Sequence, residues 1–381
     1  MSESYRAVLR VPGAGRLLVS LSAAWLSFGS VGLVVLLAAH RQTGSYTAAG
    51  VTVAAFSFGA GAFAPLRGRL VDRRGGAVLP LFAGGYALAL LGLGALAQER
   101  ASAWTAVVVA AAAGCSAPPL VASVRAAWST LIDPALVRRA YGLTSLLADA
   151  GVVVAPALGG VLFTWSAWSA LAVCAGSALV AAGLAAPLVR LTDTGVRPPR
   201  IPGAASELRI VLALSVALGA SLGLVEVAVP LQASRFGAAT YSGFLLGSFA
   251  LGSVAGALWS GRRSWPGRPV DRYLWSALAI GLLMAPVAAA SSPAGLAPLL
   301  VLAGIGYGPA TVALFEALDV LAPTRAVEAL TWVTTAEAIG TAGGAAGAGA
   351  LGQHIAGWTP FVVASALLAI PAALALAARR S

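Results

Sequence analysis

The sequence predicts an all-α integral membrane protein with twelve transmembrane helices, arranged as two bundles of six. Three observations support this fold class. Hydrophobic residues make up 59% of the 381 residues and charged residues only 10%, whereas soluble domains carry about 25% charged residues. Twelve apolar runs each approach the length of about 20 residues that one helical crossing requires. The arginines are concentrated in alternate gaps between these runs.

The apolar runs predict helices, because they are continuous, whereas the strands of a membrane barrel alternate apolar and polar residues. The first run is too long for a signal peptide, so we expect it to be a retained helix. The twelve expected spans are 17–39, 46–66, 77–97, 103–125, 140–162, 167–189, 208–231, 240–261, 274–291, 296–320, 329–351 and 358–378.

The arginines predict the orientation of these spans. All 24 basic residues are arginine, and 21 of them fall in the termini and in every second gap, while Arg41, Arg100 and Arg235 fall in the others. Basic residues favour the cytoplasmic side. We therefore expect a multi-pass protein of the inner (plasma) membrane with both termini in the cytoplasm. The net charge of +11 does not indicate a nucleic-acid partner, because no polar domain is available to hold a duplex.

A polar segment in the middle of the chain predicts two domains. Residues 190–206 contain Pro198, Pro199 and Pro202, which is typical of a linker. We expect an N-terminal six-helix bundle at 1–189, a cytoplasmic linker at 190–206 and a C-terminal six-helix bundle at 207–381. Two repeated halves are typical of transporters whose site lies near the membrane midplane between them.

The gap after the second span carries a motif. Gly68, Leu70, Asp72, Arg73 and Gly75 match the pattern Gly-x-Leu-x-Asp-Arg-x-Gly. This segment resembles the signature loop of the major facilitator superfamily, although Gly76 and Ala77 replace the basic residues that follow in the family. The resemblance implies the major facilitator fold and a loop that latches the two halves. Its gating residues would be Gly68, Arg69, Asp72, Arg73, Arg74 and Gly75. A solvated turn with orienting charges is the alternative.

The fifth expected span holds a second motif. It resembles the antiporter motif of superfamily drug exporters, Gly-x-x-x-Gly-Pro-x-x-Gly-Gly, with one glycine replaced by alanine. The matching residues are Gly151, Ala155, Pro156, Gly159 and Gly160. Small residues four apart permit close helix packing, which is also the alternative interpretation. An arginine in the middle of the fourth helix, found in other exporters, is absent, since Arg125 is expected at the cytoplasmic end of that span.

Five acids fall inside expected spans: Asp149, Glu226, Glu316, Asp319 and Glu337. Each ionised side chain at the centre of a bilayer costs about 2.5–3.5 kcal/mol. We expect these acids to face a cavity, to pair or to be protonated, and we take them as candidates for proton or substrate binding. Asp149 can alternatively pair with Arg125 or Arg139. Glu316 and Asp319 lie three residues apart on one helix face and can share a proton.

Enzyme chemistry is not expected. No nucleophile–base pair, metal cluster or nucleotide-binding loop is present, and the two histidines, His40 and His354, fall in expected outer loops. We expect no cofactor and no metal.

The sequence therefore predicts a monomeric secondary transporter that exports a small amphipathic compound by proton antiport, with neutral or cationic substrates favoured by the acids. One alternative is a nutrient importer or facilitator of the same fold. The other is a receptor or scaffold that transports nothing.

Overall fold

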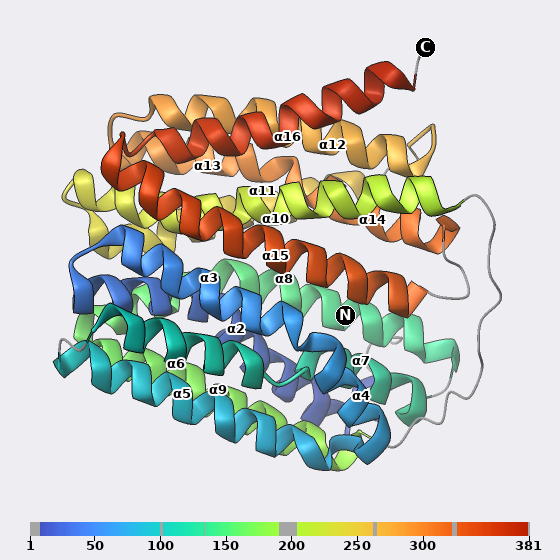
Figure 1. Cartoon of the computed structure of the whole chain (residues 1–381). Coiled ribbons are helices and arrows are strands. Elements are labelled where there is room, and N and C mark those ends of the chain that lie inside the picture. Colours follow the sequence, from blue (N-terminus) through green and yellow to red (C-terminus); the bar gives the residue numbers. More distant parts are fainter. Residues whose placement is uncertain are drawn as a thin grey trace.

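The computed structural model describes residues 8–99, 102–132, 134–189, 204–261, 265–321 and 326–379. Every regular element in these ranges is a helix. In Figure 1, α2 to α9 (blue to green) occupy the lower part of the molecule and α10 to α16 (green to red) the upper part.

Each of the first six predicted spans contains helix. The elements are α2 (Ala14–Thr43), α3 (Tyr46–Ala62), α4 (Ala64–Arg74), η1 (Gly75–Val78), α5 (Leu79–Glu99), α6 (Ala103–Ser116), α7 (Leu120–Leu131), α8 (Pro134–Trp165), α9 (Ala167–Ala185) and η2 (Ala186–Leu188).

The last six predicted spans are helical as well. Their elements are α10 (Ala204–Arg235), η3 (Ala239–Tyr241), α11 (Ser242–Gly261), α12 (Pro269–Met284), η4 (Ala285–Ala289), α13 (Pro293–Ile305), α14 (Tyr307–Leu321), α15 (Ala326–His354) and α16 (Thr359–Ala378).

Length and hydropathy identify the membrane-crossing candidates. Within the described residues, nine helices are long and apolar enough to cross a bilayer, or ten if the bent pair Tyr46–Ala62 and Ala64–Val71 is one span. The molecule is thus a multi-pass membrane protein, and twelve crossings remain a prediction.

Several predicted spans are broken, and prolines explain where. Pro65 lies in the first turn of α4, and α3 and α4 meet at a bend of 42°. Pro118 and Pro119 separate α6 from α7, because proline lacks an N–H and disfavours helix at the residue before it. The predicted loop at 68–74 is therefore wrong in its local structure: these residues are helical in α4.

Two buried hydroxyl pairs occur at matching places in the chain. Ser27 of α2 and Tyr86 of α5 are joined by a hydrogen bond of 3.2 Å. Ser215 of α10 and Tyr273 of α12 are joined by one of 3.0 Å. In each pair, the first long helix of a half (α2 or α10) is joined to the helix of the third predicted span of that half (α5 or α12). The two bonded residues are 59 positions apart in the first pair and 58 in the second.

Close glycine contacts recur in the same way. A Cβ atom at Gly114 of α6 would collide with the carbonyl oxygen of Phe56 in α3. A Cβ atom at Gly304 of α13 would collide with the carbonyl oxygen of Phe249 in α11. These glycines let α6 approach α3 closely, and α13 approach α11. The two halves thus form the same kind of helix contact with different sequences.

The molecule has two ends that differ in charge. We call the end that carries Arg69, Arg73, Arg268 and Arg379 the basic end, and the opposite end, where α2 finishes at Thr43, the distal end. The basic end holds the C-terminus, at the upper right of Figure 1.

Helices from the first half of the chain meet helices from the second half near the distal end. The Tyr46 hydroxyl donates to the Pro230 carbonyl at 3.3 Å, and Thr47 Oγ1 donates to the Gly349 carbonyl at 3.1 Å. Close by, Gly243 of α11 packs directly on the Pro156 carbonyl of α8. The distal end is therefore closed by direct contacts of α3 with α10 and α15, and of α8 with α11.

Candidate functional site

Glu226 lies in α10, and its carboxyl group faces α2 from the first half of the chain. A Cβ atom at Gly32 of α2 would lie 2.8 Å from Glu226 Oε1 and 3.3 Å from its Cδ. The absence of a side chain at Gly32 therefore creates the space in which this carboxyl group sits. The Glu226 side chain is partly buried, and both of its sequence neighbours, Val225 and Val227, are buried.

Glu337 lies in α15, which packs along α10. The backbone carbonyl of Glu337 approaches Gly219 so closely that any Cβ there would overlap it. The Thr341 hydroxyl donates back to the same carbonyl at 2.9 Å. These contacts fix the backbone at Glu337 against α10, while its side chain stays partly buried.

Tyr307 lies in the same region of the second half of the chain as Tyr273, Glu226 and Glu337. Tyr307 begins α14 directly after Gly306, and its ring packs against Phe249 at 5.9 Å with an interplanar angle of 66°. The sequence analysis missed this tyrosine, because nothing in its own neighbourhood marks it as polar or buried. The break between α13 and α14 is what places it.

Within the part of the chain that the structure describes, none of the ion pairs involves either carboxylate, Glu226 or Glu337. The Glu226 carboxyl group contacts Gly32, and its chain neighbours Leu224, Val225 and Val227 belong to the buried apolar core. A carboxyl group in such surroundings is suited to bind a proton.

The other predicted acids are placed differently. Glu316 of α14 forms an ion pair with Arg272 of α12 at 2.6 Å, and 45% of its side chain is exposed. This pairing gives Glu316 a partner at the basic end. Asp319 lies in α14 and Asp149 in α8, and the side chains of both fall outside the described residues, as does any pairing of Asp149 with Arg125.

The antiporter-like motif in α8 forms close contacts with two helices. A Cβ atom at Gly151 would lie 2.5 Å from Trp25 Cβ, and one at Gly159 would lie 2.6 Å from Ser30 Cβ, so α8 packs tightly on α2. Gly29 of α2 in turn faces Ala155, which stands where the motif has a glycine; a Cβ at Gly29 would lie 2.8 Å from Ala155 Cβ.

The end of the same motif contacts the other half. A Cβ atom at Gly160 would lie 3.3 Å from the Gly243 backbone, and Gly243 packs on the Pro156 carbonyl. Pro156 and Gly160 of the motif are thus part of the contact between α8 and α11 at the distal end.

The predicted gating residues lie on α4 and its C-terminus. Arg69, Arg73 and Arg74 are exposed, and the Asp72 side chain is outside the described residues. Gly75 ends the helix with φ +69°, where its N–H donates to the Val71 carbonyl, and this positive φ explains the need for glycine. Gly68 lies inside α4 in open space.

Arg67, which the sequence analysis did not select, is the buried arginine of this segment. It is 6% exposed and donates from Nη1 to the carbonyls of Gly114 (2.5 Å) and Cys115 (2.9 Å), and from Nη2 to that of Ala60 (2.5 Å). Carbonyls at a helix C-terminus lack intrahelical partners. Arg67 therefore caps the end of α6 and holds α3, α4 and α6 together at the bend.

Arg125 was expected at the end of its helix, but the structure places it elsewhere. It lies in the middle of α7, the second piece of the broken fourth span, and it is engaged in an interaction. The expected boundary at residue 125 was wrong because the helix continues to Leu131 after the proline break.

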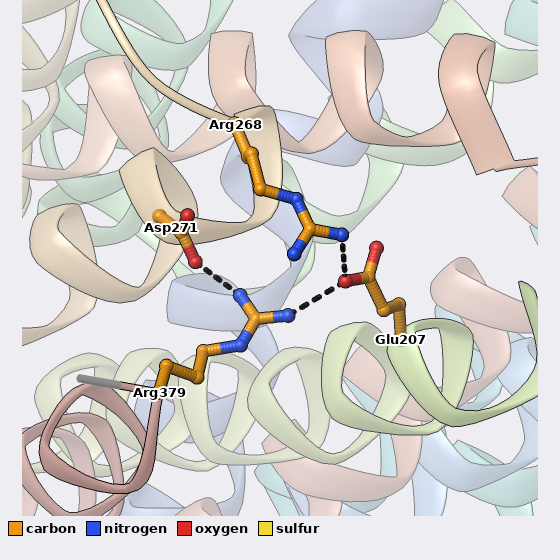
Figure 2. Close-up of polar contacts among 4 residues, drawn as sticks. All are labelled: Glu207, Arg268, Asp271 and Arg379. Carbon is orange, nitrogen blue, oxygen red and sulfur yellow. Dashed lines mark hydrogen bonds and ion pairs between the residues drawn. The ribbon is translucent and has the colours of Figure 1, made fainter. Parts of the chain in front are cut away.

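A charge cluster ties the second-half helices together at the basic end (Figure 2). The Arg379 guanidinium lies between Asp271 of α12 and Glu207 of α10, and its Nη2 is 2.8 Å from Glu207 Oε1. Arg268 pairs with the same Glu207 oxygen from the other side. These pairs connect the basic ends of α10, α12 and α16.

Metal binding finds no support in the described residues, in which no group of three histidine, cysteine or acidic side chains could hold an ion. His40 was expected in a loop but lies within α2, four residues before Gly44, whose N–H donates to the His40 carbonyl.

Comparisons with known proteins agree with this architecture. The family model of the Major Facilitator Superfamily matches residues 17–345, most of the chain. No curated protein matches this chain.

Several solved structures share its fold. The human organic anion transporter MFSD10 (TETRAN) is 17% identical with a TM-score of 0.66, covering 97% of this chain and 99% of its own. The nucleoside transporter NupG is 15% identical with a TM-score of 0.71, covering 96% and 98%. The POT family transporter PepTSo is 11% identical with a TM-score of 0.74, covering 97% and 98%. At these identities the likeness concerns the fold.

Proposed function

This chain belongs to the Major Facilitator Superfamily, and we propose that it exports a small amphipathic compound by proton antiport through alternating access. In this proposal twelve helices cross the membrane as two six-helix bundles, 1–189 and 207–381, joined by the linker 190–206. The basic end faces the cytoplasm and the distal end faces outward, as the positive-inside rule favours.

The observation that carries the proposal is that Glu226 and Glu337, two carboxyl groups within the helical bundle, form no ion pair with another described residue. An ionised carboxylate in the membrane interior costs about 2.5–3.5 kcal/mol on insertion scales. Protonation removes this cost, so Glu226 and Glu337 are suited to take up a proton in one arrangement of the halves and to release it in another.

Glu226 is the stronger candidate for coupling, because it touches the other half. Its carboxyl group sits in the space over Gly32 of α2. A neutral carboxyl group fits between two apolar helices, whereas an ionised one favours separation and hydration. Proton binding at Glu226 would thus bias the halves toward the arrangement described above, in which the distal end is closed.

The direction of transport rests on the α8 motif. Its resemblance to the antiporter motif and its close contacts with α2 and α11 support export. The carboxyl groups of Glu226 and Glu337 favour neutral or cationic substrates over anions. The printed names of the structural neighbours cover nucleosides, organic anions and a POT family member, so they do not select among substrate classes.

The experiment uses purified protein in liposomes that contain a trapped pH dye. The liposomes are challenged with a panel of amphipathic cations, neutral drugs and nucleosides, for wild type and for Glu226→Gln, Glu337→Gln and Asp149→Asn. Substrate-dependent proton movement that is lost in Glu226→Gln, with substrate binding retained, supports the proposal. Glu316→Gln is the control acid, because Glu316 already pairs with Arg272.

Other outcomes decide between the alternatives. Substrate flux without proton movement identifies a facilitator, and accumulation of substrate in intact cells identifies an importer. Absence of flux for every compound, with binding of a ligand retained, favours a receptor.

A further inference from the structure

A cavity of about 460 Å³ lies at the distal end, away from the two carboxylates. Both halves of the chain line it. His40 and Arg41 come from α2, Tyr46 from α3, Phe163 and Thr164 from α8, and Thr240 from η3. Its volume is within the range of about 300–1,000 Å³ that is usual for small-molecule sites. We call this cavity the distal vestibule.

The charge of the distal vestibule is the opposite of that of the interior site. Among the described residues that line it, none is acidic, and Arg41 is the only side chain with a permanent charge. Arg41 is exposed, and none of the ion pairs formed by described residues involves it. An exposed guanidinium without a carboxylate partner is suited to bind a carboxylate, sulfonate or phosphate group through two parallel hydrogen bonds.

Aromatic side chains form another part of the wall. The rings of His40 and Tyr46 are stacked, with centroids 3.9 Å apart and an interplanar angle of 23°. Tyr46 is held rigidly, because its hydroxyl donates to the Pro230 carbonyl across the contact between the halves. Phe163 and Leu37 add apolar surface. A flat apolar body can pack on this wall while its charged group reaches Arg41.

The hydroxyl groups of the lining complete the match. Ser234 and Thr164 donate to backbone carbonyls of their own helices, and Ser242 donates to the Ala239 carbonyl of η3. A hydroxyl group that donates in this way keeps oxygen lone pairs that can accept from a ligand O–H or N–H. The lining is thus amphipathic, with one cation, one aromatic wall and several weak acceptors.

We propose that the distal vestibule is a binding site for amphipathic aromatic anions, with Arg41 as the group that holds the anion. The site differs from the acidic interior in charge, so its ligands are not the neutral or cationic compounds favoured there. Because both halves line it, the site exists while the distal end is closed. A ligand bound there stabilises that arrangement in proportion to its occupancy.

The test is direct binding of 2-naphthoate to the full chain in nanodiscs, measured by isothermal titration calorimetry. The matched probe is 2-naphthalenemethanol, which has the same rings and no charge. Wild type is expected to bind 2-naphthoate and to bind the alcohol at least about tenfold more weakly, because two charged hydrogen bonds to the exposed Arg41 are lost. Binding does not depend on orientation in the membrane or on proton coupling, so this result is independent of the proposed function.

Variants locate the site. Arg41→Gln is expected to lose the preference for 2-naphthoate over the alcohol, and Arg41→Lys to retain part of it, because lysine keeps the charge and not the planar fork. Arg10→Gln removes one exposed arginine at the basic end and is expected to bind as wild type does. Phe163→Ala is expected to weaken both probes equally. Thermal unfolding of each variant confirms that it is folded.

The proposal is overturned if wild type binds neither probe, if it binds both with equal affinity, or if folded Arg41→Gln binds 2-naphthoate as tightly as wild type.

Discussion

The carboxyl group of Glu226 and the backbone of Gly32 are in contact across the two halves of the chain, so that a Cβ atom at Gly32 would lie 2.8 Å from Glu226 Oε1. In the proposed mechanism, this contact is the place at which a proton bound to the second half acts on the first. The Glu226 carboxyl group occupies the space that a side chain at Gly32 would fill. Even a small substitution at Gly32 is therefore expected to displace this carboxyl group.

Gly32→Val is therefore expected to displace the Glu226 carboxyl group and to disfavour the arrangement with the closed distal end. Overpacking of this kind costs about 1–3 kcal/mol, which is about a five- to hundredfold change in an equilibrium between states. Substrate-driven proton movement in liposomes is expected to fall accordingly. Gly183→Val is the matched control, because a Cβ at Gly183 of α9 meets nothing within 4 Å. Equal proton movement in the two variants would contradict the contact.

The two hydroxyl pairs predict two equal energetic couplings. Ser27→Ala with Tyr86→Phe, and Ser215→Ala with Tyr273→Phe, form two double-mutant cycles. Each buried hydrogen bond is expected to contribute about 0.5–1.5 kcal/mol to the free energy of unfolding. Thermal or denaturant unfolding in detergent measures both cycles. A coupling confined to one half would show that the repeated geometry does not carry repeated energetics.

Arg67→Gln is expected to destabilise the protein far more than Arg69→Gln. Arg67 is 6% exposed and bonds three carbonyl oxygens, whereas Arg69, two residues away on the same helix, is exposed. Hydrogen bonds to a charged group contribute about 1.5–3 kcal/mol each to the free energy of unfolding. The substitution would also leave carbonyl groups at the end of α6 without a hydrogen-bond donor, which costs further stability. The melting temperatures of the two variants, measured side by side, check this. Similar losses would mean that the α6 cap is not needed at the bend.

Arg379→Gln is expected to cost more than Arg268→Gln at the basic end. Arg379 pairs with both Glu207 and Asp271 and has 21% of its side chain exposed, whereas Arg268 pairs with Glu207 alone and has 64% exposed. Exposed ion pairs contribute at most about 1 kcal/mol and weaken in salt. Melting curves at low and high salt measure the difference. If Arg268→Gln is the more damaging variant, Arg379 is not the centre of the cluster.

The sequence predicted the helical ranges well, because an apolar run of membrane length has few other solutions. It placed Glu226 and Glu337 within helices for the same reason, and their role in proton or substrate binding stays a prediction. It did not predict the local structure of 68–74, because glycine and charged residues indicate a turn locally, while Pro65 starts a new helix there instead.

The other features of the candidate sites depend on how distant helices pack together, which the sequence does not reveal. Arg67 looked like one more orienting arginine, and its burial depends on where the end of α6 lies. Tyr307 depends on the break after Ile305. The distal vestibule is formed by residues from five separate stretches of the chain, and only the stretch with Gly160 carries a motif. Glu316 was a candidate for proton sharing until α12 placed Arg272 beside it.

The twin hydroxyl pairs and the twin glycine contacts show that the two halves are joined internally at corresponding points. A serine and a tyrosine meet twice, 59 and 58 residues apart, although the sequences around them differ. Glu226 lies in the second half, and the glycine that accommodates its carboxyl group lies in the first. A substitution in one half can therefore reach an acid of the other half without altering that half's own scaffold.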